Sequence, residues 1–316
     1  NRASWMDVLK GVHEAYVNNI DKLTKQANQL TKHLVQLNIV ASKQGQEEET
    51  APIASKEEIE IIAQRILQNA DNVWGGFGNA PKFPQTFALQ TLLRHYHLFS
   101  DKTSLAHVEL TLDKMIQGGI YDHVGGGFSR YSTDAQWQAP HFEKMLYDNG
   151  LLVSVLSEAY QITGKLAYKA VIEQTIQFLN RELSNGAGVY YAALDADSEG
   201  VEGKYYVWTK EEIDAVLGED APLFCAFYQV KMEGNWEHTN ILWTTNTLEE
   251  GALPAFEKAK QQLFQVRSNR IRPGLDHKII LSWNCLMVMA LCKSYAAIGK
   301  ETYKEKAKEV MNWLEE

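Results

Sequence analysis

Apolar side chains recur at helical spacing along most of the chain. In residues 4–39 they fall on one face of a helix, which predicts a long amphipathic helical region. The side chains that mark this face are Trp5, Val8, Leu9, Val12 and Tyr16. The polar, acidic stretch "SKQGQEEETAPIA" follows, and its composition is typical of a linker. We therefore expect a helical segment over residues 1–40 and a linker over residues 41–54.

A separate domain is predicted over residues 55–316. Ser55-x-x-Glu58 is a capping box that opens its first helix, and Thr209-x-x-Glu212 caps a later, short one. The first helix is expected at about 55–72. Further helical patterns lie at about 86–99, 103–117, 140–162, 165–183, 254–267 and 282–298, and a last one begins near Glu301.

The connections between these helices alternate in length. Long loops rich in glycine and aromatic residues alternate with turns of two or three residues. Helices joined by short turns are antiparallel neighbours, so all the long loops should emerge at one end of the domain. This pattern predicts a mainly α fold, an α/α toroid of helical hairpins. The segment "GVYYAALDADSEGVEGKYYVWT" predicts a small β-hairpin insertion at the mouth that the loops surround.

Composition narrows the class of partner. The chain has 316 residues and a net charge of −9, with no long block of one sign. Nucleic acid is therefore not an expected partner, because phosphate neutralisation requires a clustered basic face. Carbohydrate or another neutral small molecule fits this charge better. No apolar run reaches about 18 residues, so we expect no membrane-spanning helix. The chain begins at Asn1 and stops within the helical pattern "KEVMNWLEE", which suggests a piece of a longer protein.

The cysteines indicate a reducing compartment. There are three, an odd number, and none belongs to a CxxC motif, so we expect a cytoplasmic protein. Cys285 and Cys292 are seven residues apart and share a helix face, which suggests that they pack in the core.

Four motifs carry a resemblance to a known family. They read "GGFGNAPKFP", "GGIYDHVGGGFSRYSTDAQWQAPHFEKMLYDNG", "LDADSEG" with "GKYYVWT", and "DHKIILSWN". The chain resembles the YyaL family, thioredoxin-domain-containing proteins related to spermatogenesis-associated protein 20, over about residues 55–300. The resemblance implies an upstream thioredoxin-like domain followed by an (α/α)6 barrel of the six-hairpin glycosidase type, which is also similar to N-acylglucosamine 2-epimerase. Residues 1–40 would then be the helical tail of the upstream domain plus a connecting helix, and about four and a half of the six hairpins would be present.

Three places depart from the family pattern. Cys285 stands where the family usually has glycine after Trp-Asn, and His277 stands where a second acid is expected. The segment "GNWEHTNIL" lacks the glycine that usually precedes the Asn-Ile-Leu element. All three lie on or beside the mouth loops.

The loop at residues 118–149 concentrates the candidate chemistry. Gly125, Gly126 and Gly127 do not form a phosphate loop, since no Gly-Lys-Ser/Thr follows, so a steric role is expected. Aromatic faces beside acids and amides are how proteins bind sugar rings, although the same aromatics could simply pack the loop onto the barrel. The expected substrate-binding residues are Tyr121, Phe128, Arg130, Tyr131, Trp137, Glu143, Asp148, Asp195, Lys278, Trp283 and Asn284.

Carboxylates supply the first catalytic hypothesis. Glycoside hydrolysis uses one protonated and one ionised carboxyl group. Asp197 and Asp276 are the first choices for this pair and Asp122 is the third. Each acid also has a structural explanation: Glu143 could favour a helix dipole after Pro140, Asp148 could pair with Lys144, and the "DADSEG" acids could form a turn.

Histidines supply a second hypothesis. A sugar 2-epimerase moves a proton beside a carbonyl, and His123 and His141 are candidates for that work. Neither the zinc nor the calcium ligand pattern is present, so no metal and no cofactor are expected. A third hypothesis is a non-catalytic module that binds a glycan or a partner and serves the upstream thioredoxin-like domain.

Overall fold

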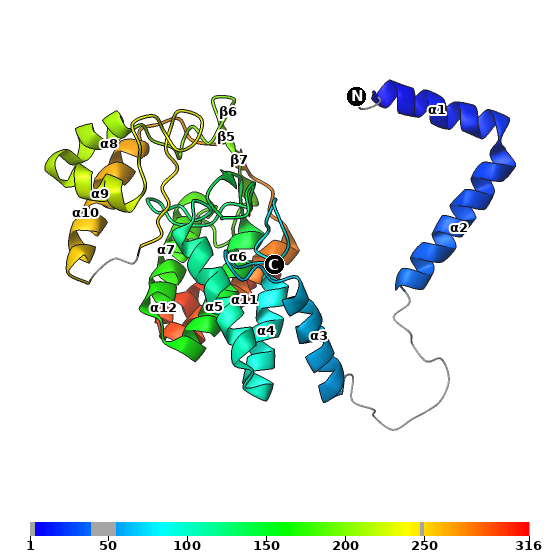
Figure 1. The fold of residues 1–316 in the computed structure, drawn as a ribbon, viewed down its shortest axis with the longest axis horizontal. Coiled ribbons are helices and arrows are strands. Elements are labelled where there is room, and N and C mark those ends of the chain that lie inside the picture. The colour runs from blue at the N-terminus through cyan, green and yellow to red at the C-terminus, as the bar shows by residue number, and fades with distance from the viewer. Residues whose placement is uncertain (1–3, 39–54, 247–249, 316) are drawn as a thin grey trace. The chain divides into compact units, whose positions relative to one another are not determined.

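The chain divides into two compact units, residues 1–54 and 55–316. The computed structural model describes residues 4–38, 55–246 and 250–315. In the first unit, the expected single helical region is two helices, α1 (Trp5–Asn18) and α2 (Ile20–Asn38) (Figure 1). They are separated at Asn19, whose φ of −142° is not helical. The predicted linker over residues 41–54 lies outside the described residues, and the assignment of residues 1–40 to an upstream domain stays a prediction.

The second unit is mainly helical, as the periodicity predicts. Ser55 caps its first helix, because its hydroxyl accepts a hydrogen bond from the Glu58 amide at 3.1 Å. The helices are α3 (Lys56–Gln68), α4 (Thr86–Phe99), α5 (Lys102–Gln117), α6 (Leu146–Thr163), α7 (Leu166–Glu182), α8 (Lys210–Leu217), α9 (Ala221–Phe227), α10 (Leu253–Arg267), α11 (Leu281–Ile298) and α12 (Glu301–Glu315). The helix expected from residue 140 begins only at Leu146, because the residues before it are extended.

Short strands join the long loops to one another. They are β1 (Tyr131–Ser132), β2 (Pro140–His141), β3 (Lys144–Met145), β4 (Ala193–Leu194), β5 (Asp197–Ser198), β6 (Val201–Glu202) and β7 (Leu275–Asp276). All pairs are antiparallel, in the orders β1–β2, β3–β4–β7 and β5–β6. Met145 faces Ala193, and Ala193 faces Asp276. The start of α6, the loop after α7 and the start of α11 therefore meet at one end of the unit, which confirms the predicted gathering of the long loops.

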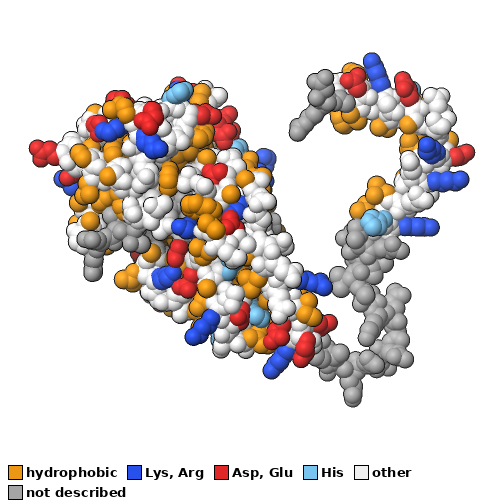
Figure 2. Space-filling view, in the orientation of Figure 1, with side chains coloured by type: hydrophobic (Ala, Val, Ile, Leu, Met, Phe, Trp, Pro, Cys, Tyr) orange, Lys and Arg blue, Asp and Glu red, His pale blue; other side chains and the backbone are white. Residues whose placement is uncertain are grey.

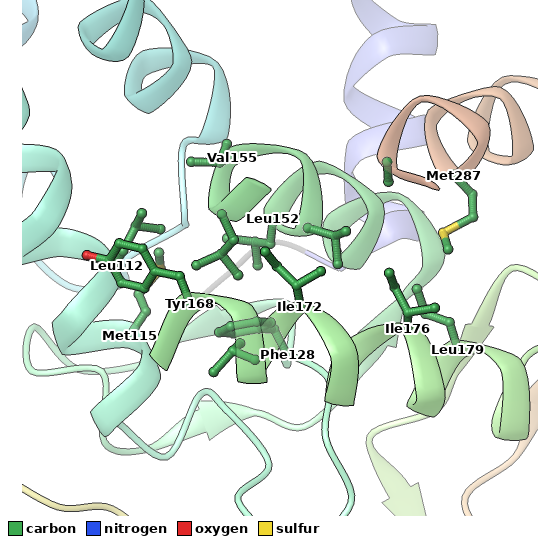
Figure 3. Close-up of a cluster of buried hydrophobic side chains, with 14 of the residues drawn as sticks. Leu112, Met115, Phe128, Leu152, Val155, Tyr168, Ile172, Ile176, Leu179 and Met287 are labelled. Carbon is green, nitrogen blue, oxygen red and sulfur yellow. The ribbon is translucent and has the colours of Figure 1, made fainter. Parts of the chain in front are cut away.

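The helices form two layers. In one layer α6 packs against both α4 and α11; in the other α5, α7 and α12 cover α4, α6 and α11 respectively. This arrangement is an incomplete α/α toroid of helical hairpins, the predicted fold class. Figure 3 shows the core between the layers, where Leu152 of α6, Ile172 and Ile176 of α7 and Met287 of α11 lie close together.

A second group of helices, α8 to α10, lies between α7 and α11 in the sequence. These three helices lie together, apart from the other helices of the unit (Figure 1). They have their own apolar core around Trp208, Phe224 and Phe256. The predicted β-hairpin that leads into this group is much shorter than expected. Only β5 and β6 pair as a hairpin, because β4 pairs with β3 and β7 instead.

Helix α11 meets the length and composition of a membrane-spanning helix. It packs along α6 and α12, however, and the hydroxyls of Ser294 and Ser157 meet at 3.1 Å in that contact. The helix thus belongs to the helical layers. Cys285 and Cys292, which we expected to pack, are both exposed on it. On the face shown in Figure 2, basic and acidic side chains are interspersed over the protein surface.

Two asparagines hold loop backbone against the first turns of α6 and α11. The Asn149 amide oxygen accepts from the Phe128 amide at 2.7 Å, and its nitrogen donates to the Phe128 carbonyl at 3.0 Å. Asn284 makes the same pair of bonds with Tyr190, at 2.9 and 3.1 Å. Both asparagines are fully buried. The equivalent bonds show that each asparagine fixes a loop to the first turn of its helix: the loop before α6 for Asn149 and the loop after α7 for Asn284.

We expect Asn284→Ala to lower the free energy of unfolding by about 2 kcal/mol or more, because it leaves buried backbone groups of Tyr190 without partners. Urea denaturation followed by circular dichroism measures this loss. Asn269→Ala is the matched control: Asn269 is exposed and its side chain makes a single 3.2 Å bond. Equal stability losses in Asn284→Ala and Asn269→Ala would show that the hydrogen bonds of Asn284 to Tyr190 do not stabilise the loop.

Candidate functional site

Asp122 anchors the central loop. Its carboxylate accepts hydrogen bonds from the amides of Val124 and Gly125 at 3.0 and 2.9 Å. Arg267 binds both carboxylate oxygens at 2.9 Å, and Lys144 binds one at 2.8 Å. Burial alone would raise the pKa of Asp122, but the charges of Arg267 and Lys144 outweigh it and hold the pKa far below its ordinary value. A carboxyl group that stays ionised in this way favours a structural role over the catalytic role that the sequence suggested.

The glycine run is explained by close packing around this anchor. A Cβ on Gly125 would lie 2.0 Å from a terminal nitrogen of Arg267. Gly127 has a φ of +82°, and a Cβ there would meet the Phe178 ring of α7 at 2.4 Å. The expected steric role therefore fits, although the loop packs on α7 and on the end of α10.

His123 is a neutral, partly buried histidine. Its Nε2 lies 3.0 Å from the carbonyl oxygen of Gly118, and its ring packs edge-on against Tyr121 and Tyr228. Burial lowers its pKa to about 4. A histidine that resists protonation this strongly is poorly suited to take up a proton at neutral pH.

Most of the candidate aromatics belong to the core. Tyr121, Phe128 and Trp137 are buried. The Tyr121 hydroxyl donates to Gln174, and the Trp137 indole donates to the Trp74 carbonyl at 2.9 Å. Of the four aromatics named from this loop, only Tyr131 is partly exposed. The packing alternative therefore describes the other three better than sugar binding does.

A cluster at the start of α6 brings together several of the expected binding residues. Glu143 forms an ion pair with Arg130 at 3.1 Å, and Asp148 lies in the first turn of α6. Tyr147 precedes Asp148, and its ring packs against Trp283 of α11 with centroids 4.8 Å apart. Arg130 and Tyr147 also interact through their polar groups. The cluster thus joins the loop before α6 to the start of α11.

Asp148 is the unusual acid of this cluster. Burial raises its pKa to about 7, and the negative charge of Glu143 acts in the same direction. The Tyr147 hydroxyl and the Arg130 guanidinium oppose the rise. Its Oδ2 is buried and has no hydrogen-bond partner among the described residues. Asp148 can therefore hold a proton near neutral pH while a second carboxylate stands close by.

An aromatic stack extends from this cluster. The His141 and Tyr131 rings stack with centroids 5.1 Å apart, and Tyr131 stacks in turn on Phe83 at 4.8 Å. The Nδ1 of His141 lies 2.7 Å from the Glu202 carboxylate, and its Nε2 lies 3.7 Å from Glu143. His141 therefore shares the site of Glu143. No contact joins it to His123 in the described part of the chain.

The acids of the later loops lie at the same end of the unit but outside this cluster. Asp195 and Asp197 are exposed around the β5–β6 hairpin, and Asp276 pairs with the exposed Lys278 at 2.9 Å. That ion pair and the Lys278 amide lower the pKa of Asp276. Asn284 is buried and its amide is occupied by Tyr190, so its side chain is closed to a ligand, contrary to its expected binding role.

Sequence similarity identifies the relatives of this chain. No family model matches it. Human spermatogenesis-associated protein 20 is 32% identical over an alignment of 340 residues, which covers 95% of this chain and 43% of that protein. The mouse protein of the same name is 36% identical over 278 residues, covering 75% and 35%. The chain is homologous to part of spermatogenesis-associated protein 20. The resemblance drawn from the motifs is confirmed, and the chain spans less than half the length of these relatives.

Solved structures were also compared with the chain. A glycoside hydrolase family 76 mannosidase from Bacteroides thetaiotaomicron has a TM-score of 0.45 at 9% identity, covering 74% of this chain and 44% of that one. The cellobiose 2-epimerase from Bacillus thermoamylovorans has a TM-score of 0.39 at 11% identity, covering 82% and 86%.

Four residues that contact the Asp122 anchor or the site around Asp148 and Glu143 were not predicted as site residues: Lys144, Tyr147, Arg267 and Glu202. Lys144 was considered only as a partner of Asp148, whereas it pairs with Asp122. Lys144 and Tyr147 lie inside the long central motif, next to Glu143 and Asp148 respectively. Their position beside named candidate acids could have indicated that they belong to the site. Arg267 is 145 residues from Asp122, and Glu202 is 61 residues from His141. Spacing along the chain gives no sign of such contacts. Among the described residues, no group of three or more His, Cys, Asp or Glu side chains could hold a metal ion.

Proposed function

We propose that the long-loop end of the helical unit hydrolyses a glycosidic bond, with Asp148 as general acid and Glu143 as its ionised partner. The supporting observation is the pair itself. Asp148 has a pKa raised to about 7, and Glu143 is held by the Arg130 guanidinium at 3.1 Å. Hydrolysis requires one carboxyl group that carries a proton and one that does not. This pair takes the place of Asp197 and Asp276, which are more exposed and lie outside the cluster.

A neutral sugar fits the surroundings of the pair. Tyr131 is stacked between Phe83 and His141, so the exposed Phe83 ring and the partly exposed His141 ring are the ends of this stack that can meet a sugar. Trp283 beside Tyr147 adds further apolar surface near charged groups. Sugar rings place their CH faces on aromatics and their hydroxyls on charged or amide groups. We therefore propose a carbohydrate substrate.

The test is a screen of oligosaccharides and aryl glycosides, followed by Glu143→Gln on any substrate that reacts. The variant is expected to lose about 100-fold or more of kcat, as for removal of a catalytic carboxylate. Glu199→Gln is the control, since Glu199 is an exposed acid paired with Lys204 on the β5–β6 hairpin. Activity within about twofold of the original protein in Glu143→Gln would rule out the assignment.

A second candidate function is a sugar isomerase. Its support is the 2.7 Å contact of His141 with Glu202, which orients the ring as a base. Running the same screen in deuterium oxide separates the two reactions, because an isomerase introduces deuterium at the carbon beside the carbonyl. A glycan that binds without any conversion would favour the third possibility, a binding module of a cytoplasmic thioredoxin-like protein.

A further inference from the structure

A cavity lies beside the Asp122 anchor. Its volume is about 230 Å³, and it lies between the end of α7, the end of α10 and the residues before β7. Its charged lining consists of Lys144, Arg181, Arg267 and Arg272 against Asp122 and Glu182, a formal balance of four minus two, or +2. The residues of the Asp148 cluster are not part of this lining. The cavity is therefore a separate site.

The acids of this cavity are already occupied. Asp122 is engaged by Arg267, Lys144 and two backbone amides. Glu182 pairs with Arg181 at 2.6 Å and with Arg272 at 2.9 Å. The excess positive charge is thus not neutralised by any further acid that lines the cavity.

Hydrogen-bond donors remain unused here. The Nε of Arg267 and the hydroxyl of Tyr206 are buried and have no partner among the described residues. Both side chains line the cavity, and Arg267 is only 2% exposed. The Lys144 ammonium uses two of its three hydrogens on oxygen acceptors, Asp122 and the Gly126 carbonyl. A buried donor without an acceptor destabilises the folded protein, so an oxygen that accepts from these groups would stabilise it.

We propose that this cavity binds a small oxyanion, either a free ion such as phosphate or the phosphate or carboxylate group of a larger ligand. Oxyanions carry several acceptor oxygens and no obligatory donors, which matches a site with spare donors and excess positive charge. Arg267 offers a planar guanidinium, Lys144 a point charge and Tyr206 a neutral donor. The volume is below the roughly 300 Å³ typical of sites for drug-sized ligands, so the charged group is the part that enters.

The affinity depends on pH through Lys144. Burial lowers its pKa to about 8, against the opposing charge of Asp122 and with further lowering by Arg267 and Arg181. Tyr206 also faces this region, and burial raises its pKa, so it stays a donor. Lys144 is charged below pH 8 and neutral above it. Binding is therefore strongest below about pH 7 and weakens as the pH rises through 8; sulfate, whose charge is constant in this range, is the suitable probe.

The experiment is calorimetric titration of the 316-residue chain with sulfate, phosphate and acetate in separate arms. Tyr206→Phe keeps the ring beside Arg267 and removes only a hydroxyl that bonds no described residue, so it should fold normally. We expect its sulfate affinity to fall about tenfold, the loss of one hydrogen bond to a charged group. Tyr295→Phe is the control, because Tyr295 does not line the cavity and its hydroxyl bonds Glu301.

Comparison of the three titrations also shows which class of anion the cavity prefers. Tighter binding of sulfate and phosphate than of acetate assigns the site to tetrahedral anions, and the reverse assigns it to carboxylates. Absence of saturable binding of all three anions at 10 mM or so would mean that water alone fills the cavity and would overturn the proposal. Equal affinities of Tyr206→Phe and the unmodified chain would also overturn it. None of these readouts depends on hydrolytic activity.

Discussion

Asp122→Ala is expected to destabilise the protein by about 3–5 kcal/mol, because it leaves Arg267 and Lys144 buried without their counter-ion. The Asp122, Arg267 and Lys144 side chains are only 9%, 3% and 1% exposed, so the two cations are largely removed from bulk solvent. The loss should appear in urea denaturation at pH 7, followed by circular dichroism.

Asp276→Ala is the matched control for this effect. Asp276 also forms an aspartate–cation pair, with Lys278, but the two side chains are 40% and 75% exposed. Exposed pairs contribute about 0–1 kcal/mol, so this variant should remain nearly as stable as the original chain. A loss below about 1 kcal/mol in Asp122→Ala would show that the buried pair does not anchor the loop.

The second large effect concerns activity. On a substrate found by screening, Asp148→Asn should reduce kcat by about 10²–10⁴-fold, the usual contribution of a positioned general acid. With the unmodified protein, the rate should fall as the pH rises through about 7, since Asp148 is needed in its protonated form and burial raises its pKa to about 7. Asp214→Asn, at a partly exposed aspartate paired with Lys210 on α8, should leave the rate unchanged.

Asp148→Asn also has a stability signature that does not need a substrate. The unfolded chain ionises Asp148 near the ordinary value of 3.8, whereas the folded protein resists ionisation until about pH 7. The unmodified protein therefore loses stability at this position as the pH rises from about 4 to 7, and asparagine does not. The stability of Asp148→Asn relative to the original should increase from pH 4 to pH 8. A pH-independent difference would mean that the pKa of Asp148 is not raised.

Helical periodicity predicted the fold class well because each helix buries one continuous face. It placed α4, α5, α7, α10 and α11 within about one residue of their observed ends. It failed at residues 140–145, where Pro140 suggested a helix start. Those residues are extended because β2 pairs with the nearby β1 and β3 pairs with the distant β4. Strands of two residues are too short to leave an alternating pattern in the sequence.

The candidate site was predicted less completely, for a physical reason. The central motif correctly indicated the loop that carries the site. Four of its residues lie together in the structure: Arg130, His141, Glu143 and Asp148. The sequence could not rank its acids, because a pKa depends on burial and on charges brought from elsewhere. Asp122 and Asp148 look alike in sequence, yet Arg267 keeps one ionised and burial keeps the other protonated near neutral pH.

The position of Arg267 has a consequence for engineering. It is the last residue of α10, and its guanidinium links the α8–α10 group to the glycine loop, in addition to the apolar contacts of His123 with Tyr228 and of Val124 with the core of that group. A chimera that takes α8–α10 from a relative must therefore place a basic side chain where Arg267 lies. Without it, Asp122 loses its bidentate partner even if the backbone is joined without distortion.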